Sequence, residues 1–166
     1  DVGLQRLLGF AAKYGLSGLE GLSGVPGRLG GAVAMNAGSY GCEIKDVLAR
    51  VRVFTPSQGL RWLDVDEVEL GYRHFALRGS EDEWFVVDAC EVNLTRLAPE
   101  SIRAAMRANF AKKKATQPVT APTAGCVFKN PPGRAAAAMI DSLGLKGLRR
   151  GGAMVSESHA NFIVNK

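Results

Sequence analysis

The stretch GLEGLSGVPGRLGGAVAMNAGSYG (residues 18–41) decides what kind of fold this chain can form. Its glycines are too frequent for regular structure at the start, and only GGAVAMNA (residues 30–37) has the composition of a short helix. Long glycine-rich loops are generally functional, because glycine lets the backbone turn sharply and approach a ligand closely. The stretch therefore predicts a long functional loop around one short helix.

The spacing of these glycines excludes the two commonest nucleotide-binding loops, since neither GxxxxGK[ST] nor GxGxxG occurs. A different cradle is needed, in which bare backbone N–H groups face a flat ring or a pyrophosphate. The glycines suited to this are Gly27, Gly30, Gly31 and Gly38. Asn36 and Tyr40 would add side-chain hydrogen bonds. From spacing alone, a tight connection between packed elements is an equally good interpretation.

The segments that flank the loop predict one helix and several strands. Apolar residues recur at helical spacing over residues 3–14, which predicts a first amphipathic helix. Val51 and Val53 alternate with arginines ahead of a turn signal at residues 56–59, which predicts a hairpin. The run at residues 84–94 predicts another strand. Together these strands indicate a mainly antiparallel sheet.

The sequence pattern changes near residue 98, where a longer helix is predicted. Residues 101–114 carry apolar side chains on one helical face and Arg and Lys on the other. The elements predicted beyond it are an extended segment at 125–130, a helix at 135–143, and strands near 153–155 and 161–164. We therefore predict an α+β protein with two domains, residues 1–98 and residues 99–166, of which the second is a small α/β unit.

Composition narrows the class of protein but not its function. The 166 residues are 46% hydrophobic and 22% charged, which is typical of a folded globular chain. No uncharged apolar stretch reaches the roughly 18 residues of a membrane span, so we expect a cytoplasmic protein with no membrane partner. The three cysteines show no CxxC pairing, and neither a disulfide framework nor a metal site is expected.

The net charge of +5 permits nucleic acid or a phosphate-bearing ligand as a partner. The clearest basic run is Lys112–Lys114, and no aromatic residues are interleaved with it. We therefore expect a solvated helix end, where cations suit the helix dipole, and no nucleic-acid site.

Five segments, in this order, resemble one known family. They are GVPGRLGGAVAMNAGSYG (24–41), GYRHF (71–75), AGCVFKNP (124–131), GLKG (144–147) and SESHANFIVN (156–165). Together they closely resemble UDP-N-acetylenolpyruvoylglucosamine reductases, which are bacterial flavoenzymes of cell-wall precursor synthesis. Five ordered motifs at comparable intervals are far more specific than any single one.

The resemblance implies a fold and a reaction. The first domain would be part of an FAD-binding domain of the vanillyl-alcohol-oxidase type, and the second would be part of a UDP-sugar substrate domain. NADPH would reduce bound FAD, which would pass hydride to UDP-N-acetylglucosamine enolpyruvate and yield UDP-N-acetylmuramate for peptidoglycan. Such an enzyme is expected to be a monomer that serves cell-wall growth, cell shape and cell division.

The resemblance also assigns roles to individual residues. Arg73 would stabilise the enolate formed during reduction, and Cys126 would donate the proton that completes it. The residues expected to hold FAD are Gly24, Val25, Pro26, Gly27, Gly30, Gly31, Ala32, Asn36, Gly38, Tyr40 and Gly41. The residues expected to contact the UDP-sugar are Tyr72, Lys129, Asn130, His159 and Asn161.

The two catalytic assignments have plainer alternatives when the residues are considered alone. Arg73 follows an acidic segment at residues 64–69, so composition favours a surface salt bridge. A free cysteine such as Cys126 is more often a small buried hydrophobe. The family usually has serine at this position, but a thiol with a reference pKa of about 8.5 is the stronger acid, so proton donation remains feasible. His74 and His159 would more often be surface or satisfied histidines.

Two parts of the family pattern are expected to lie outside this sequence. An earlier glycine-serine-asparagine loop does not occur in residues 1–17, and the family's further catalytic glutamate lies beyond its His-Ala-Asn-Phe segment, where this sequence has only residues 163–166. Two alternatives therefore stay open. One is a fragment that binds flavin or sugar nucleotide without activity, and the other is an FAD oxidoreductase of the same fold that oxidises a small alcohol.

Overall fold

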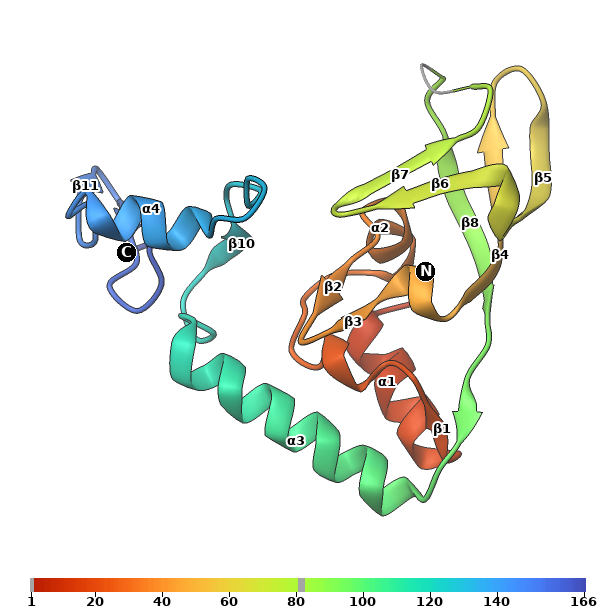
Figure 1. The fold of residues 1–166 in the computed structure, drawn as a ribbon, viewed down its shortest axis with the longest axis horizontal. Helices are drawn as coiled ribbons and strands as arrows, with labels where there is room; N and C mark the ends of the chain where they lie inside the picture. The colour runs from red at the N-terminus through yellow and green to blue at the C-terminus, as the bar shows by residue number, and fades with distance from the viewer. Residues whose placement is uncertain (1, 81–82) are drawn as a thin grey trace. The chain divides into compact units, whose positions relative to one another are not determined.

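The computed structural model describes residues 2–80 and 83–166, which form two compact units (Figure 1). The chain divides between Phe110 and Ala111, inside helix α3 (Pro99–Thr116). The boundary predicted after residue 98 thus coincides with the start of this helix, while the contacts divide the chain further along it. The mixture of helices and antiparallel strands confirms the predicted α+β class.

The first unit contains the predicted first helix, the glycine-rich segment and most of the strands. Its helices are α1 (Leu4–Lys13) and α2 (Leu29–Ala34), with short 3-10 turns η1 (Glu20–Leu22), η2 (Ile44–Asp46) and η3 (Val65–Glu67). Its strands are β1 (Leu16–Ser17), β2 (Gly38–Ser39), β3 (Cys42–Glu43), β4 (Leu48–Thr55), β5 (Gly59–Asp64), β6 (Val68–Gly71), β7 (His74–Leu77), β8 (Val86–Val92) and β9 (Thr95–Arg96). The strands pair as β1–β9, β2–β3, β5–β4–β8 and β6–β7, and every pairing is antiparallel, as predicted.

The three-stranded sheet β5–β4–β8 forms because its alternating sequence gives it one apolar face. Val51 and Val53 of β4 are fully buried. On the opposite face, Arg52 forms a 2.6 Å ion pair with Asp88 of β8 and lies over the ring of Trp62 of β5. The predicted hairpin is therefore confirmed, and β8 extends it into a sheet.

Helix α2 lies against the third strand of this sheet and brings the glycine-rich segment onto the core (Figure 1). Ala32 and Val33 are its buried residues. A Cβ added at Gly30 would lie 3.4 Å from the Val87 carbonyl oxygen, so glycine allows close packing on β8. The largest fully buried apolar side chains of this unit are Leu4, Leu8, Leu22, Val33, Ile44, Val51, Val53, Leu63, Val68, Leu77 and Ile102. The segment predicted as a long loop is thus partly structured and packed.

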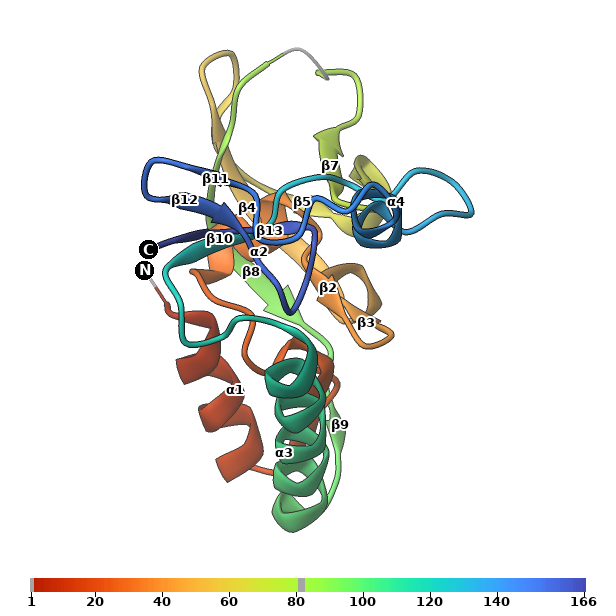
Figure 2. The same cartoon turned by 90° about the vertical axis from the view of Figure 1, so that its left-hand side faces the viewer.

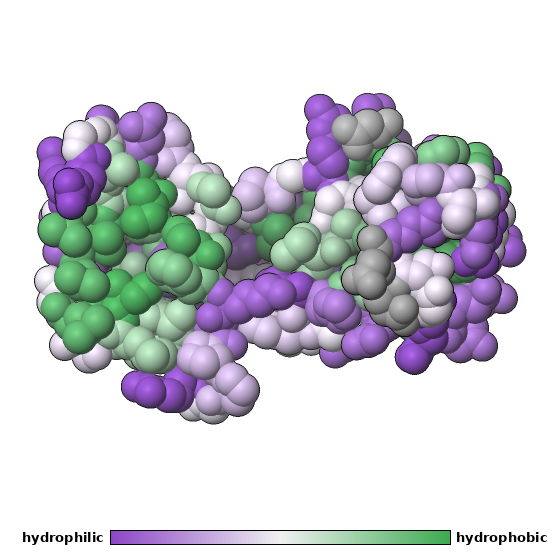
Figure 3. All heavy atoms as spheres, turned by 90° about the horizontal axis from the view of Figure 1, so that it is seen from above, coloured by the Kyte–Doolittle hydropathy of each residue, from purple (hydrophilic) through white to green (hydrophobic). Residues whose placement is uncertain are grey.

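The second unit is a small four-stranded sheet with one helix (Figure 2). Its elements are β10 (Thr123–Cys126), α4 (Ala136–Ser142), β11 (Arg149–Arg150), β12 (Ala153–Val155) and β13 (Phe162–Asn165), and the sheet order is β10–β13–β12–β11. Large apolar side chains remain exposed on this unit, where Figure 3 shows hydrophobic residues gathered together. They include Val119, Val127, Phe128, Leu143, Leu148 and Ile163.

Two predictions for this half of the chain need correction. The extended segment predicted at residues 125–130 is strand only as far as Cys126, because the backbone bends at residues 127 and 128. Lys113 lies in the basic run predicted to be a solvated helix end, but its side chain is buried, with only 4% of the residue exposed. Burial lowers the pKa of Lys113.

Candidate functional site

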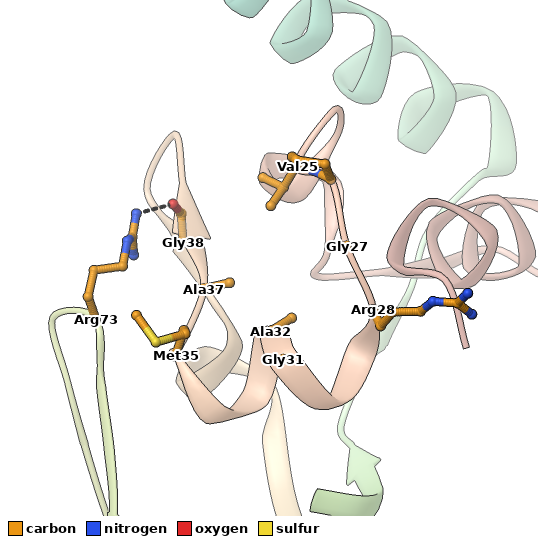
Figure 4. Close-up of a pocket in the computed structure, with 10 residues that line it drawn as sticks. Val25, Gly27, Arg28, Gly31, Ala32, Met35, Ala37, Gly38 and Arg73 are labelled. Atoms are coloured by element: carbon orange, nitrogen blue, oxygen red, sulfur yellow. Dashed lines mark hydrogen bonds between the residues drawn. The ribbon is translucent and has the colours of Figure 1, made fainter. Parts of the chain in front are cut away.

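The glycine-rich segment forms one side of a pocket of about 320 Å³ in the first unit (Figure 4). The loop at Val25–Gly27, the turns of α2 and the start of β2 surround it, and Arg73 reaches it from the β6–β7 turn. The residues that line it are Val25, Pro26, Gly27, Arg28, Gly31, Ala32, Met35, Ala37, Gly38 and Arg73. Seven of these were predicted site residues, so six residues of the glycine-rich motif and Arg73 line one pocket.

Two of the pocket glycines are required by the protein's own packing or backbone conformation, and a third is not. A Cβ at Gly38 would lie 2.6 Å from Glu43 Cγ, and Gly27 has a φ of 113°, so both positions demand glycine for the protein's own sake. Gly31 has neither constraint: apart from its chain neighbours and the backbone of its own helix, no described atom lies within 4 Å of its Cβ position. Glycine in a helix costs up to about 1 kcal/mol relative to alanine. A bare backbone at Gly31 therefore leaves room for a ligand to approach α2 closely.

Arg73 is held at the pocket by backbone carbonyl groups. It occupies the β6–β7 turn with a left-handed φ of 53°. Its guanidinium donates to Gly38 O at 2.5 Å and to Asn36 O at 3.4 Å, and it lies over the ring of Tyr72. In the acidic segment that precedes Arg73, the carboxylate of Glu69 pairs with His74, 3.4 Å away. Arg73 keeps further N–H donors that a carboxylate or enolate can accept from.

Asn36 connects the glycine-rich segment to the elements that carry Arg73. Its side-chain amide nitrogen donates to Glu43 Oε2 at 3.1 Å and to Gly71 O at 2.8 Å, and its amide oxygen accepts from Lys45 N at 2.9 Å. Asn36 is fully buried, so this amide has no atom to offer a ligand. The predicted side-chain hydrogen bond from Asn36 to the cofactor is therefore corrected: the residue shapes the backbone around the pocket.

The other predicted flavin residues lie beside the pocket and do not line it. Gly24 occupies a turn ahead of Val25, with a φ of 72°, and Gly30 packs on β8. Tyr40 and Gly41 form the β2–β3 turn, both with left-handed backbone. Gly41 lines a second cavity of about 400 Å³ with Gly38, Ser39, Cys42, Glu43, Lys45, Asp46 and Arg73.

Three pocket residues were not predicted, namely Arg28, Met35 and Ala37. All three lie between predicted residues of the same continuous segment. That sequence position was the signal by which they could have been predicted. Figure 4 shows the Arg28 side chain pointing away from the pocket, so only its backbone borders the cavity. Met35 is partly exposed and contributes an adaptable apolar surface of the kind that packs against rings.

The electrostatics of the first unit centre on Glu43. The ammonium group of Lys45 lies 2.8 Å from Glu43 Oε2 and holds the pKa of Glu43 below its ordinary value, with support from Asn36 and Arg73. Burial raises the pKa of Cys42 and of Cys90, so these thiols are held protonated. Neither cysteine therefore has the character of a reactive thiolate.

The predicted proton donor, Cys126, ends strand β10 in the second unit and is exposed. It lies opposite Phe162 of β13, beside an irregularity in the strand pairing. Because the backbone bends after Cys126, strict strand alternation does not separate its side chain from that of Lys129.

Asn161 fixes the backbone that follows Cys126. Its amide nitrogen donates to Phe128 O at 2.8 Å, its amide oxygen accepts from Phe128 N at 3.0 Å, and its own carbonyl accepts from Val127 N at 2.9 Å. Only 2% of the residue is exposed. The predicted contact between this side chain and substrate is corrected to a positioning role.

The two remaining polar candidates are also engaged by the protein. Asn130 Oδ1 accepts from Ala136 N at 3.0 Å, at the start of α4. His159 Nδ1 accepts from Asn161 N at 3.3 Å, and its ring meets Phe162 edge-on. Burial lowers the pKa of His159, which favours the neutral ring. Both residues are still partly or fully exposed, so their substrate contacts stay predictions.

Within residues 2–80 and 83–166, no cluster of three or more His, Cys, Asp and Glu side chains is arranged to hold a metal ion. No helix in that part of the chain combines the length and apolar character that crossing a bilayer requires.

Comparisons with known proteins match both units. Residues 2–64 match a family model described as an FAD binding domain, and residues 117–166 match the C-terminal domain of UDP-N-acetylenolpyruvoylglucosamine reductase. These matches confirm the predicted FAD-binding domain and the domain that follows it.

Curated relatives and a solved structure agree with these models. UDP-N-acetylenolpyruvoylglucosamine reductase of Nitratidesulfovibrio vulgaris is 56% identical over 164 residues, which is 98% of this chain and 55% of that protein. The same enzyme of Oleidesulfovibrio alaskensis is 49% identical over 99% of this chain and 55% of its own length. The crystal structure of UDP-N-acetylenolpyruvylglucosamine reductase from Thermus caldophilus superposes with a TM-score of 0.87 at 41% identity, covering 98% of this chain and 59% of that one. The chain spans about half the length of the curated relatives it matches.

Proposed function

The chain belongs to the UDP-N-acetylenolpyruvoylglucosamine reductase family, and from this premise we propose that its first unit binds FAD and its second unit contributes to the UDP-sugar site. The reaction proposed for the complete enzyme is NADPH-dependent reduction of UDP-N-acetylglucosamine enolpyruvate to UDP-N-acetylmuramate, a step in peptidoglycan synthesis. Because the chain spans about half of its relatives, binding is the property that we propose for residues 1–166 themselves.

The observation that carries this proposal is the pocket around Gly31. A helical glycine with no protein atom near its Cβ position, facing a pocket bordered by Val25 and Met35, leaves room for a flat apolar ring. When bound, FAD supplies the two-electron redox chemistry. The chain's own contribution is shape and charge: backbone groups of the segment 25–38 hold the ring, and Val25, Ala32 and Met35 keep water from its face.

Arg73 is proposed to stabilise negative charge that develops on the substrate during reduction. Its guanidinium is already oriented by Gly38 O and Asn36 O, so little reorganisation is needed when an anionic oxygen arrives. A guanidinium stays protonated at all physiological pH values and can meet a carboxylate or enolate in two bonds. Cys126 is proposed as the group that delivers a proton, and the bonds from Asn161 hold its following backbone in place.

The first experiment is a visible absorption spectrum of the purified chain after incubation with FAD and desalting. We expect a retained flavin band, with a perturbed shape because the ring has entered an apolar pocket. A chain that elutes colourless, at a protein concentration where circular dichroism shows it folded, would contradict the proposal that residues 1–166 bind FAD. The same test would then apply to a protein of the relatives' full length.

A further inference from the structure

The loop that forms one wall of the pocket begins with a type II turn at Leu22–Val25. Val25 N donates to Leu22 O at 3.0 Å, which closes the turn. Ser23 has φ −55° and ψ 128°, and Gly24 has φ 72°, which are the dihedral angles of the two central positions of this turn type. A type I turn over the same residues differs mainly by a flip of the peptide between Ser23 and Gly24. The orientation of that peptide therefore decides which turn is present.

One side chain, that of Gln5 in the first turn of α1, contacts this turn on three atoms. Its amide oxygen accepts from Gly24 N at 3.1 Å, and this N–H belongs to the peptide that would flip. Its amide nitrogen donates to Leu22 O at 3.1 Å and to Val25 O at 2.8 Å. A primary amide carries a donor and an acceptor side by side, which is the pattern that these three backbone atoms need.

The contacts of Gln5 extend to the pocket itself. Val25 lines the pocket, and its carbonyl, which Gln5 binds, belongs to the peptide that leads into Pro26 and Gly27 of the same wall. Further along, Leu4 N donates to Gly27 O at 3.0 Å and Leu29 N donates to Val2 O at 2.9 Å. The loop is thus hydrogen-bonded to the start of α1 at several points. Of the bonds named here, those of Gln5 are made by a side chain and the others by backbone groups.

We propose that Gln5 is a positioning residue for the flavin pocket, which latches the Leu22–Val25 turn in its type II form and fixes the wall that begins at Val25. The expected effect of Gln5 on FAD binding rests on the proposed function, whereas its effect on the Leu22–Val25 turn does not. Gln5 itself is exposed, so its value lies in the three bonds and not in packing. Without them the peptide between Ser23 and Gly24 is free to flip, and the wall samples shapes that do not match the ring.

The test compares Gln5→Met with the wild-type chain. Methionine has nearly the same length and helix propensity as glutamine but no amide, so α1 should be unaffected. We expect the dissociation constant for FAD, measured by titration calorimetry, to rise about tenfold, because hydrogen bonds that hold the wall are lost. Exchange of the Gly24 amide hydrogen, followed by NMR, should accelerate by a similar factor, since its acceptor is gone.

The matched control is Gln58→Met, the same change at the exposed tip of the β4–β5 hairpin. It should leave both the FAD affinity and the Gly24 exchange rate unchanged. Wild-type behaviour of Gln5→Met in both measurements would overturn the proposal. Faster Gly24 exchange with unchanged FAD affinity would also overturn it, because the latch would then not serve the pocket.

Gln5→Glu tests the hydrogen bonds separately from packing, because a loss of packing alone would not make FAD affinity depend on pH. An ionised carboxylate still accepts from Gly24 N but faces the carbonyl oxygens of Leu22 and Val25, whereas a protonated carboxyl group can donate again. FAD binding by this variant should strengthen as the pH falls toward about 4, while the wild-type affinity changes little. A flat profile for Gln5→Glu would count against the latch. A wild-type chain that takes up no FAD would overturn the proposed function instead, and Gly24 exchange alone would then decide the latch.

Discussion

In the first unit, the motif residues surround a pocket with backbone and small side chains, whereas in the second unit the motif residues are either exposed or bound to the protein's own backbone. Gly31 lines the pocket with bare backbone, while Asn161 is buried and holds Phe128 on both its amide N–H and its carbonyl. The difference teaches that the residue type alone does not show whether a motif residue contacts a ligand or supports the protein's own backbone. A buried asparagine in such a motif shapes the backbone, and a bare glycine next to it leaves room for the ligand.

The largest effect is expected at Cys126, the exposed cysteine of the second unit. In a reductase of the relatives' full length that carries this chain, Cys126→Ser should keep turnover and Cys126→Ala should lower it about 10²- to 10⁴-fold, because general acid catalysis is lost. NADPH should still bleach the flavin of the alanine variant in stopped-flow spectra, since hydride delivery to flavin does not need this proton. Normal turnover by Cys126→Ala would contradict the proposed role of Cys126 as proton donor.

Asn161 should show the second largest effect, on stability. Asn161→Ala removes two side-chain hydrogen bonds and leaves the Phe128 N–H and carbonyl groups without those partners, at a cost of about 1–3 kcal/mol in the free energy of unfolding. Urea denaturation measures this. Asn165→Ala, at an exposed position in strand β13, which begins directly after Asn161, is the control and should change the free energy of unfolding by less than about 1 kcal/mol. Equal losses for the two variants would contradict the positioning role.

Gly31 and Gly9 form a matched pair for the first unit. Both are exposed helical glycines with no protein atom within 4 Å of the Cβ position, but only Gly31 lines the pocket. Alanine at either position should stabilise its helix by up to about 1 kcal/mol. Only Gly31→Ala should weaken FAD binding, by about tenfold, because its methyl group occupies space meant for the ring. If both variants bind FAD like the wild-type chain, the pocket is not the flavin site.

The smallest effect concerns the pH dependence that Glu43 brings to the first unit. Its pKa is lower in the folded chain than in the unfolded chain, chiefly because of Lys45, so its stabilising contribution is present above the unfolded value of about 4.3 and is lost as the pH falls through the folded value. The contribution should be below about 1 kcal/mol because the pair is partly exposed to solvent. Thermal melts of wild type and Glu43→Gln from pH 7 to pH 3 should converge at the acid end. A difference in melting temperature that stays constant with pH would show that the Glu43–Lys45 ion pair does not cause it.

The fold was largely predictable because its signals are local. The helical spacing before Gly15, the alternation around Val51 and the glycine after α4 each specify an element within a few residues. The end of the strand at Cys126 was not predictable, since the bend that follows is fixed by Asn161, which lies far along the sequence.

The candidate site was predictable where position in the motif is enough and unpredictable where partners decide. Val25, Gly27 and Gly31 were found because backbone loops keep their place in the sequence. The structural use of Asn36 was missed because its partners Glu43, Lys45 and Gly71 come from three later elements. Gln5 gave no signal at all, because an exposed glutamine in a first helical turn is unremarkable until the turn it binds is known.

That exposure has a practical consequence for protein engineering. Surface redesign for solubility or crystallisation usually replaces exposed glutamines first, on the assumption that an accessible polar side chain in a helix is interchangeable. By the role proposed for Gln5, such a change would leave α1 intact, yet it would remove the three hydrogen bonds that hold the Leu22–Val25 turn. An engineered version of this chain should therefore treat position 5 as part of the binding site, although its side chain is not among the residues that line the pocket.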